Sequence, residues 1–306
     1  MSEHSEEYKV FEARLKVLLP EEYRDRYEDV QPVSMGSAGL KFASDGRVAW
    51  DEMWGSFCDL ALAGGPPHRG RLLESASKAE IDGERGRYKQ VVDELCRGVE
   101  MVTGLAAEAS SIPGWIHVDC PSATMAGWLV RAVNIENVSS YSDGMVLHLP
   151  ASPRFRLEKE IKNVVTAIAK TSHYWLGHTS IDQHRAIADL FEIMESELPL
   201  IQAPFPAEDT RGVVFEGLRD RIAEEIHSSL GLQANGSEYY GWLGVSCDSV
   251  QSAIRMMRAM VVSNVLCRRE GDAIYIPVNP SADGSGSRVV GLLRRAYRFA
   301  GSTATS

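Results

Sequence analysis

The chain has 306 residues, 44% of them hydrophobic, and 42 acidic against 32 basic residues give it a formal net charge of −10. A chain of this length can bury one large core or two ordinary ones, and we expect two. The excess of acidic residues argues against sequence-independent binding of nucleic-acid phosphates, so nucleic acid is not an expected partner.

Cellular location and redox state follow from two further features. No stretch approaches the roughly 20 apolar residues of a membrane span, and the N-terminus MSEHSEEYKV lacks the basic and apolar segments of a secretory signal. Five cysteines without dense spacing or a CxxC pair indicate reduced thiols rather than disulfides or a thiolate zinc site. We therefore expect a cytoplasmic protein that contacts no membrane and needs no cofactor.

The first 50 residues predict two helices, the second starting at Pro20, and a short hairpin around SDGR. The next stretch, WDEMWGSFCDLALAGGPPHRG, predicts a helix followed by a proline-containing loop. In that loop Gly65 permits a ligand to approach the backbone closely. The imidazole of His68 could carry a proton, and the planar guanidinium of Arg69 beside it could bind an anion. A plain connector between helices is the alternative for this loop.

Residues 87–171 predict an ordered series of elements. An amphipathic helix at 87–102 precedes WIHVDC, whose alternation predicts a strand, and a helix follows at once. Two short runs around Asp-Gly in NVSSYSDGMVLHLP predict a hairpin. A second amphipathic helix at 158–171 closes the series.

The same series recurs later in the chain. Gly114–Pro150 aligns without a gap on Gly241–Pro277 at a constant offset of 127 residues, with twelve identical positions among 37. GLRDRIAEEIHSSLGL, which precedes the second copy, predicts an amphipathic helix. This helix is expected to end at Gly231, a residue that suits a left-handed helix cap. RVVGLLRRAYRF closes it.

The repeat predicts the fold class. We expect an internally duplicated α+β protein of helix-strand-helix-hairpin-helix units, with small, mainly antiparallel sheets and a pseudo-two-fold relation. The predicted division is a lead-in at 1–50, a first unit at 51–176 and a second at 177–306.

Cys120 and Cys247 occupy equivalent positions at a strand end and helix start, where helix N–H groups favour a thiolate. Two opposed thiols could remove a proton from one side of a carbon and deliver another from the opposite side, as in cofactor-independent racemases and epimerases. Asp248 beside Cys247 should oppose ionisation of that thiol only. Burial as small apolar residues is the alternative for both cysteines.

Five residues near these strands are further binding candidates besides the loop. Ser122 and Ser249 lie in the first helical turns, where capping is the simpler role and binding of a substrate carboxylate the functional one. Asp248 also suits a helix cap. Trp115, His117 and Trp242 lie on the other strand face, where they could line a pocket or pack in the core.

Three histidines, His173, His178 and His184, stand five and six residues apart, which does not place them on one helical face. A metal or tetrapyrrole site at these histidines is one of three functional hypotheses.

The first hypothesis is proton transfer by Cys120 and Cys247 on an amino-acid-like or carboxylate molecule. The second is a non-catalytic binding or regulatory pseudo-dimer holding a small anionic ligand between the tryptophan faces.

Overall fold

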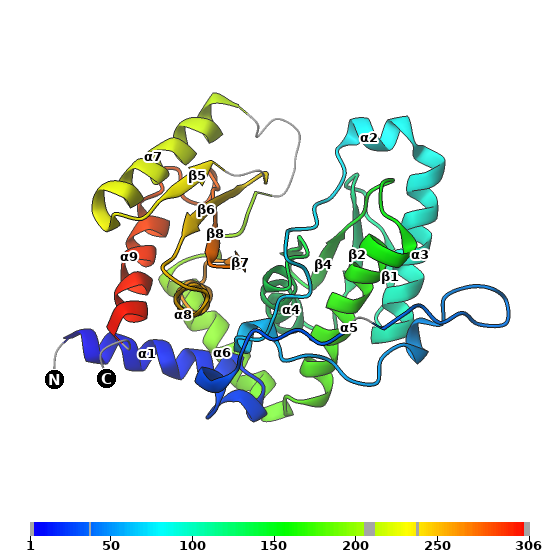
Figure 1. Cartoon of the computed structure of the whole chain (residues 1–306), viewed down its shortest axis with the longest axis horizontal. Coiled ribbons are helices and arrows are strands. Elements are labelled where there is room, and N and C mark those ends of the chain that lie inside the picture. Colours follow the sequence, from blue (N-terminus) through cyan, green and yellow to red (C-terminus); the bar gives the residue numbers. More distant parts are fainter. Residues whose placement is uncertain (1–2, 37, 205–211, 237–238, 303–306) are drawn as a thin grey trace. The chain divides into compact units, whose positions relative to one another are not determined.

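The computed structural model describes residues 3–36, 38–204, 212–236 and 239–302. The chain forms two compact units, here called the central unit (Pro20–His184) and the terminal unit (Met1–Leu19 with Arg185–Ser306). Each contains a small antiparallel sheet of four strands together with helices, which confirms the α+β class (Figure 1). The boundaries predicted at residues 50/51 and 176/177 separate repeat units and not compact units. That division stays a prediction.

The sheet of the central unit has the order β1-β2-β4-β3. Its strands are β1 Ala107–Ala109, β2 Trp115–Asp119, β3 Tyr141–Asp143 and β4 Val146–Pro150. The alternation in β2 buries Ile116 and Val118 completely and leaves Asp119 exposed, as expected for a strand with one face on the core. The predicted hairpin is confirmed, and it turns at Gly144 with a φ of 56°, which favours glycine.

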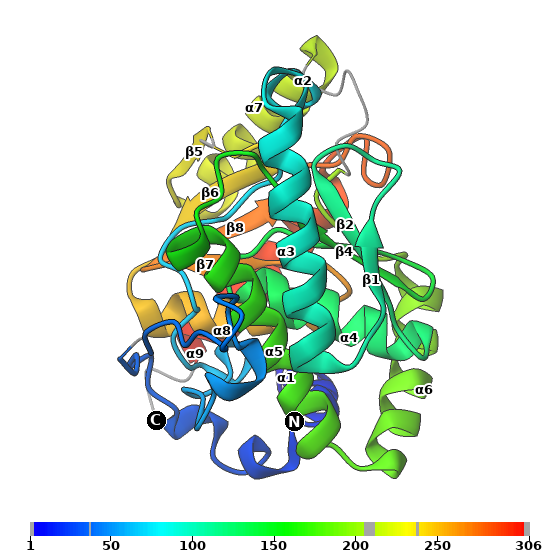
Figure 2. The ribbon, with the colours of Figure 1, turned by 90° about the vertical axis from the view of Figure 1, so that its right-hand side faces the viewer.

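The helices of the central unit are α2 Lys78–Gly83, α3 Arg85–Thr103, α4 Ala123–Ile135 and α5 Lys162–Gly177. The last three cover the sheet, and the short α2 contacts α3. Helix α3 packs on β1 and β2, α4 packs on β3 and β4, and α5 contacts both helices. Figure 2 shows α3 and α5 side by side. The core therefore lies between the sheet and three helices.

The terminal unit has a sheet of the order β5-β6-β8-β7. Its strands are β5 Ala234–Gly236, β6 Trp242–Ser246, β7 Arg268–Glu270 and β8 Ala273–Pro277. Its helices are α1 Glu3–Leu18, most of α6 Ile181–Glu197, α7 Val213–Leu230, α8 Val250–Val261 and α9 Ser287–Ser302. Gly231 caps α7 in the left-handed conformation as predicted. Across the described ranges, no helix combines the length and the apolar character needed to cross a membrane.

The two sheets share one strand order and one register. Ile116 pairs with Leu149, and 127 residues later Leu243 pairs with Ile276. Asn137 and Asn264 both have a positive φ, 61° and 63°. The correspondence extends to β1 and β5, two strands that the sequence did not predict. Duplication of an ancestral unit and a two-fold relation stay predictions.

Two predicted helices in the first 60 residues are wrong. The helix expected from Pro20 is a pair of 3-10 turns, Glu21–Tyr23 and Tyr27–Asp29, which bury the tyrosines. The helix expected after residue 50 is replaced by 3-10 turns at Trp50–Glu52 and Ala61–Ala63. In the second stretch, the backbone N–H groups of Leu60 and Ala61 donate to the side chains of Tyr23 and Glu136, so they are not available to a regular helix. The stretch IADLFEIMESELPLIQAPFPAEDTRG also predicts a helix and then a proline-containing loop. The helix lies within α6, and the loop falls mainly on 205–211, outside the described residues.

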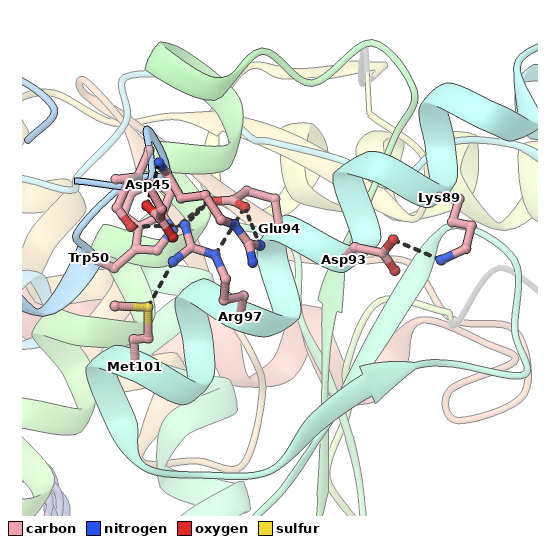
Figure 3. Close-up of polar contacts among 9 residues, drawn as sticks. Asp45, Trp50, Lys89, Asp93, Glu94, Arg97 and Met101 are labelled. Carbon is pink, nitrogen blue, oxygen red and sulfur yellow. Dashed lines mark hydrogen bonds and ion pairs between the residues drawn. The ribbon is translucent and has the colours of Figure 1, made fainter. Parts of the chain in front are cut away.

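The predicted SDGR turn is present and is fixed to α3 (Figure 3). Phe42 and Val48 form a single antiparallel bridge across it. Trp50 Nε1 donates to Glu94 Oε1 at 2.9 Å, and Arg97 bonds both Glu94 and the Val48 carbonyl. Burial alone would raise the pKa of Glu94, but these bonds hold it below its usual value.

Candidate functional site

A buried ion pair lies at the centre of the central unit. Lys170, in the middle of α5, and Glu136, directly after α4, approach to 2.9 Å between Nζ and Oε1. The side chains are only 1% and 0% exposed. Because a buried charge without a partner is very costly, each of these groups requires the other.

Glu136 also fixes the loop formed by residues 58–70. Its carboxylate accepts hydrogen bonds from the backbone N–H of Ala61 at 3.2 Å and of His68 at 2.7 Å. Within the loop, Gly65 lies so close to Asp59 that an added Cβ would be 2.1 Å from its carbonyl oxygen. The loop thus packs closely against itself at Gly65. The role of Gly65 in ligand binding stays a prediction.

Cys58 is the second partner of Lys170. The distance from Lys170 Nζ to Cys58 Sγ is 3.3 Å, and Cys58 is partly exposed. Burial alone would lower the pKa of Lys170, but Glu136 and Cys58 outweigh it and raise that pKa. The ammonium is therefore charged at neutral pH. This contact places a cation beside a partly exposed thiol.

His68 and Arg69 lie in the same loop, beside the ion pair. His68 Nε2 is 3.1 Å from Asn163 Oδ1, and the backbone N–H of Arg69 donates to the Glu136 carbonyl at 3.3 Å. Burial lowers the pKa of His68, the charges of Lys170 and Arg69 add to the effect, and Glu136 and Asn163 oppose it. The imidazole is therefore neutral at neutral pH and able to accept a proton.

Two buried tyrosines support the loop near Cys58. The hydroxyls of Tyr23 and Tyr174 are 2.8 Å apart. Tyr23 donates to Asp59 Oδ1 at 3.0 Å and accepts from the Leu60 N–H, while Tyr174 reaches the Cys58 carbonyl at 3.4 Å. Burial is the main cause that raises the pKa of both phenols, so they stay neutral. They position the Cys58 backbone.

The sequence did not identify Cys58, Glu136 or Lys170 as site residues. One signal was available: Lys170 stands three residues after Ala167 and four before Tyr174, in the apolar stripe of a predicted amphipathic helix. A charge in such a stripe must have a buried partner. The sequence alone gives no indication that Glu136 is that partner.

The predicted pair of thiols lies in two different units. Cys120 ends β2 in the central unit and Cys247 ends β6 in the terminal unit, and both are buried. Burial, with smaller contributions from Asp119 and Asp248 respectively, raises the pKa of each thiol to about 12. The expected inequality between them is wrong, because Asp119 acts on Cys120 as Asp248 acts on Cys247. Their use as a two-base pair stays a prediction.

The serines of the same turns are helix caps. Ser122 Oγ accepts from the Met125 N–H and Ser249 Oγ from the Ser252 N–H, both at 3.1 Å. Their capping role is confirmed, whereas the capping role expected of Asp248 is wrong because Ser249 takes it. Binding of a carboxylate at these turns stays a prediction.

The tryptophan faces differ between the units. In the terminal unit the guanidinium of Arg268 lies 5.0 Å from the Trp242 ring, 4.6 Å from Tyr239 and 4.1 Å from Tyr275. A side chain of the protein thus occupies the cation–π position over Trp242. In the central unit Trp115 is 3% exposed, and the neighbouring His117 pairs with Glu108 at 3.1 Å. Ligand binding at these faces stays a prediction.

The three histidines do not converge. His173 and His178 are 3.1 Å apart between Nε2 atoms, and His178 Nδ1 lies 2.7 Å from Glu22. His184 instead stacks on Trp175, with ring centres 4.1 Å apart. Within the described part of the chain, no group of three or more His, Cys, Asp or Glu side chains could hold a metal ion.

Three histidines of the central unit make its stability depend on pH. Burial is the main cause that lowers the pKa of His68, His148 and His173 below the usual 6.5. Between the lowered values and 6.5 the unfolded chain binds more protons than the folded one, so stability is present above about pH 6.5 and falls as the pH drops through this window.

Urea unfolding between pH 7.5 and 5.5 should therefore show a decreasing free energy of unfolding, and His68→Gln should flatten the slope. The exposed His227 of the terminal unit provides the control variant His227→Gln, which should leave the slope unchanged. A wild-type free energy that is constant over this range would contradict the assignment.

The chain matches no protein-family model, and comparisons with curated proteins and with solved structures return no similar chain.

Proposed function

We propose that the chain is a small-molecule enzyme whose reactive group is the thiolate of Cys58 in the central unit. One observation carries the proposal: Cys58 Sγ lies 3.3 Å from the ammonium of Lys170, which Glu136 holds in place. The other cysteines differ, because burial raises the pKa of Cys96, Cys120 and Cys247 to about 12 and that of Cys267 further. Cys58 is the thiol that combines partial exposure with an adjacent cation.

The proposed chemistry is an isomerase-type proton transfer on a carboxylate or amino-acid-like molecule. The Cys58 thiolate takes a proton from the carbon next to the carboxylate and later returns a proton to that carbon. His68, a neutral imidazole in the same loop, carries protons, and Arg69 binds the carboxylate. The protein would work in a reducing compartment such as the cytoplasm, because the thiol must stay reduced.

The two-base mechanism with Cys120 and Cys247 is a separate proposal. It also requires that the chain is internally duplicated and that the two copies are related by a two-fold axis. Its support is the equivalent position of the two residues at strand ends. A pKa of about 12 suits a thiol that donates a proton and disfavours one that must remove it.

Isotope exchange tests the function. Candidate amino and hydroxy acids are incubated with the protein in deuterated water, and label at the α-carbon is measured by mass spectrometry. Label should appear with wild type, disappear with Cys58→Ser and persist with Cys120→Ser and Cys247→Ser. Loss of exchange with the last two variants alone would support the two-base mechanism instead. Absence of exchange with every candidate, together with five protected thiols, would favour a non-catalytic binding module.

A further inference from the structure

An arginine-lined groove lies in the terminal unit, among α1, the ends of α6 and α8, and α9. Two adjoining pockets of about 330 and 310 Å³ share five of its residues, Arg14, Glu197, Ser263, Leu292 and Arg295. Helix α1 is held against α9 by aromatic contacts, with the Phe11 and Phe299 rings 5.7 Å apart (Figure 1). The groove is therefore built by packed helices.

One half of the groove is strongly basic. Arg14, Arg288 and Arg295 line it with a single glutamate, Glu197, which pairs with Arg14 at 2.5 Å. Arg288 and Arg295 make no hydrogen bond or ion pair with any residue that the structure describes, and both are exposed. In a chain with a net charge of −10, two arginines that line one pocket and form no ion pair favour an anion from outside.

The other half of the groove is mainly apolar. To the shared residues this half adds one acidic residue, Glu7, and six apolar residues, Val10, Phe11, Ala259, Val262, Ala296 and Phe299. Val10 remains 53% exposed there. Inorganic phosphate would leave this half unused, while a hydrocarbon chain would bury it.

We infer that the groove binds a small organic anion with an apolar tail, a carboxylate on a hydrocarbon chain being the simplest case. The carboxylate accepts hydrogen bonds from Arg288 and Arg295, and the chain lies along Val10, Phe11 and Val262. This site goes beyond the proposed function, because it lies in the terminal unit and shares no residue with the Cys58 site.

The test is calorimetric titration of the full chain with sodium octanoate, with sodium acetate and octanol as probes that lack the tail or the charge. Octanoate should bind, octanol should bind at least about tenfold more weakly, and affinity should fall about fourfold for each methylene removed from the acid. Arg288→Gln with Arg295→Gln should weaken octanoate at least about tenfold. The control, Arg221→Gln with Arg298→Gln, removes the same charge from exposed positions outside these pockets and should leave the affinity unchanged.

Four results would overturn the inference: no measurable binding of octanoate, equal binding of octanol, equal binding of inorganic phosphate, or equal weakening by both pairs of variants. Because the replaced arginines are exposed, the unfolding midpoints of the variants should match that of wild type. A matching midpoint separates loss of binding from loss of folding.

Discussion

Replacing Lys170 by methionine should lower the free energy of unfolding of the central unit by about 3–5 kcal/mol. The change leaves the Glu136 carboxylate buried, at 0% exposure, without its cation. Lys170→Met combined with Glu136→Gln should recover a large part of this loss, because the remaining amide oxygen can still accept a hydrogen bond from the loop backbone. The free energies are measured by urea unfolding at pH 7.5.

The chain offers a matched control for this substitution. Lys89 and Asp93 on α3 form an ion pair at 2.8 Å, but their side chains are 75% and 57% exposed (Figure 3). Lys89→Met should change the free energy of unfolding by at most about 1 kcal/mol. Similar losses for Lys89→Met and Lys170→Met would contradict the importance given to burial of the Glu136 pair.

The second large effect is expected at Gly65. An alanine there would place its Cβ 2.1 Å from the Asp59 carbonyl oxygen and 2.5 Å from the carbonyl carbon. Both are backbone atoms, so the loop itself must move, and we expect a loss of about 1–3 kcal/mol in the free energy of unfolding. The shift also displaces the chain next to Cys58.

Gly70, in the same loop, is the control for this change. A Cβ built at Gly70 meets nothing within 4 Å, so Gly70→Ala should stay within about 0.5 kcal/mol of wild type. The unfolding midpoints in urea of the two variants give the comparison. Equal midpoints for Gly65→Ala and Gly70→Ala would show that the loop is not tightly packed around Gly65.

Local periodicity was enough to predict much of the fold. The alternation of WIHVDC and its repeat after Gly241 predicted β2 and β6, and the Asp-Gly turn and its repeat predicted both hairpins. Strands β1 and β5 were missed because three-residue edge strands carry no measurable period. The segment from Cys58 to Gly70 was partly misjudged, since its conformation depends on hydrogen bonds to a residue far along the chain.

The site could be predicted only in part for the same reason. His68, Arg69 and Gly65 were predicted from their local chemistry. The backbone N–H groups of His68 and Arg69 bond to Glu136, and Gly65 packs against Asp59 in the same loop, but binding of a ligand by these residues stays a prediction. Cys58 and Lys170 are 112 residues apart in sequence, and only the tertiary fold brings them together. Cys120 and Cys247 were predicted as catalytic residues because their repetition can be recognised in the sequence. The burial and the neighbours of a thiol cannot.

The most direct measurement of the central claim is the alkylation rate of each cysteine with iodoacetamide at pH 7.5, followed by peptide mass spectrometry. Cys58 should react about 100-fold or more faster than Cys96, Cys120 and Cys247, whose pKa of about 12 keeps them protonated. The rate at Cys58 should fall at least about tenfold when Lys170→Gln and Glu136→Gln remove both charges together. A Cys58 that reacts no faster than the other thiols, or whose rate is unaffected by the double substitution, would contradict the claim that Lys170 activates it.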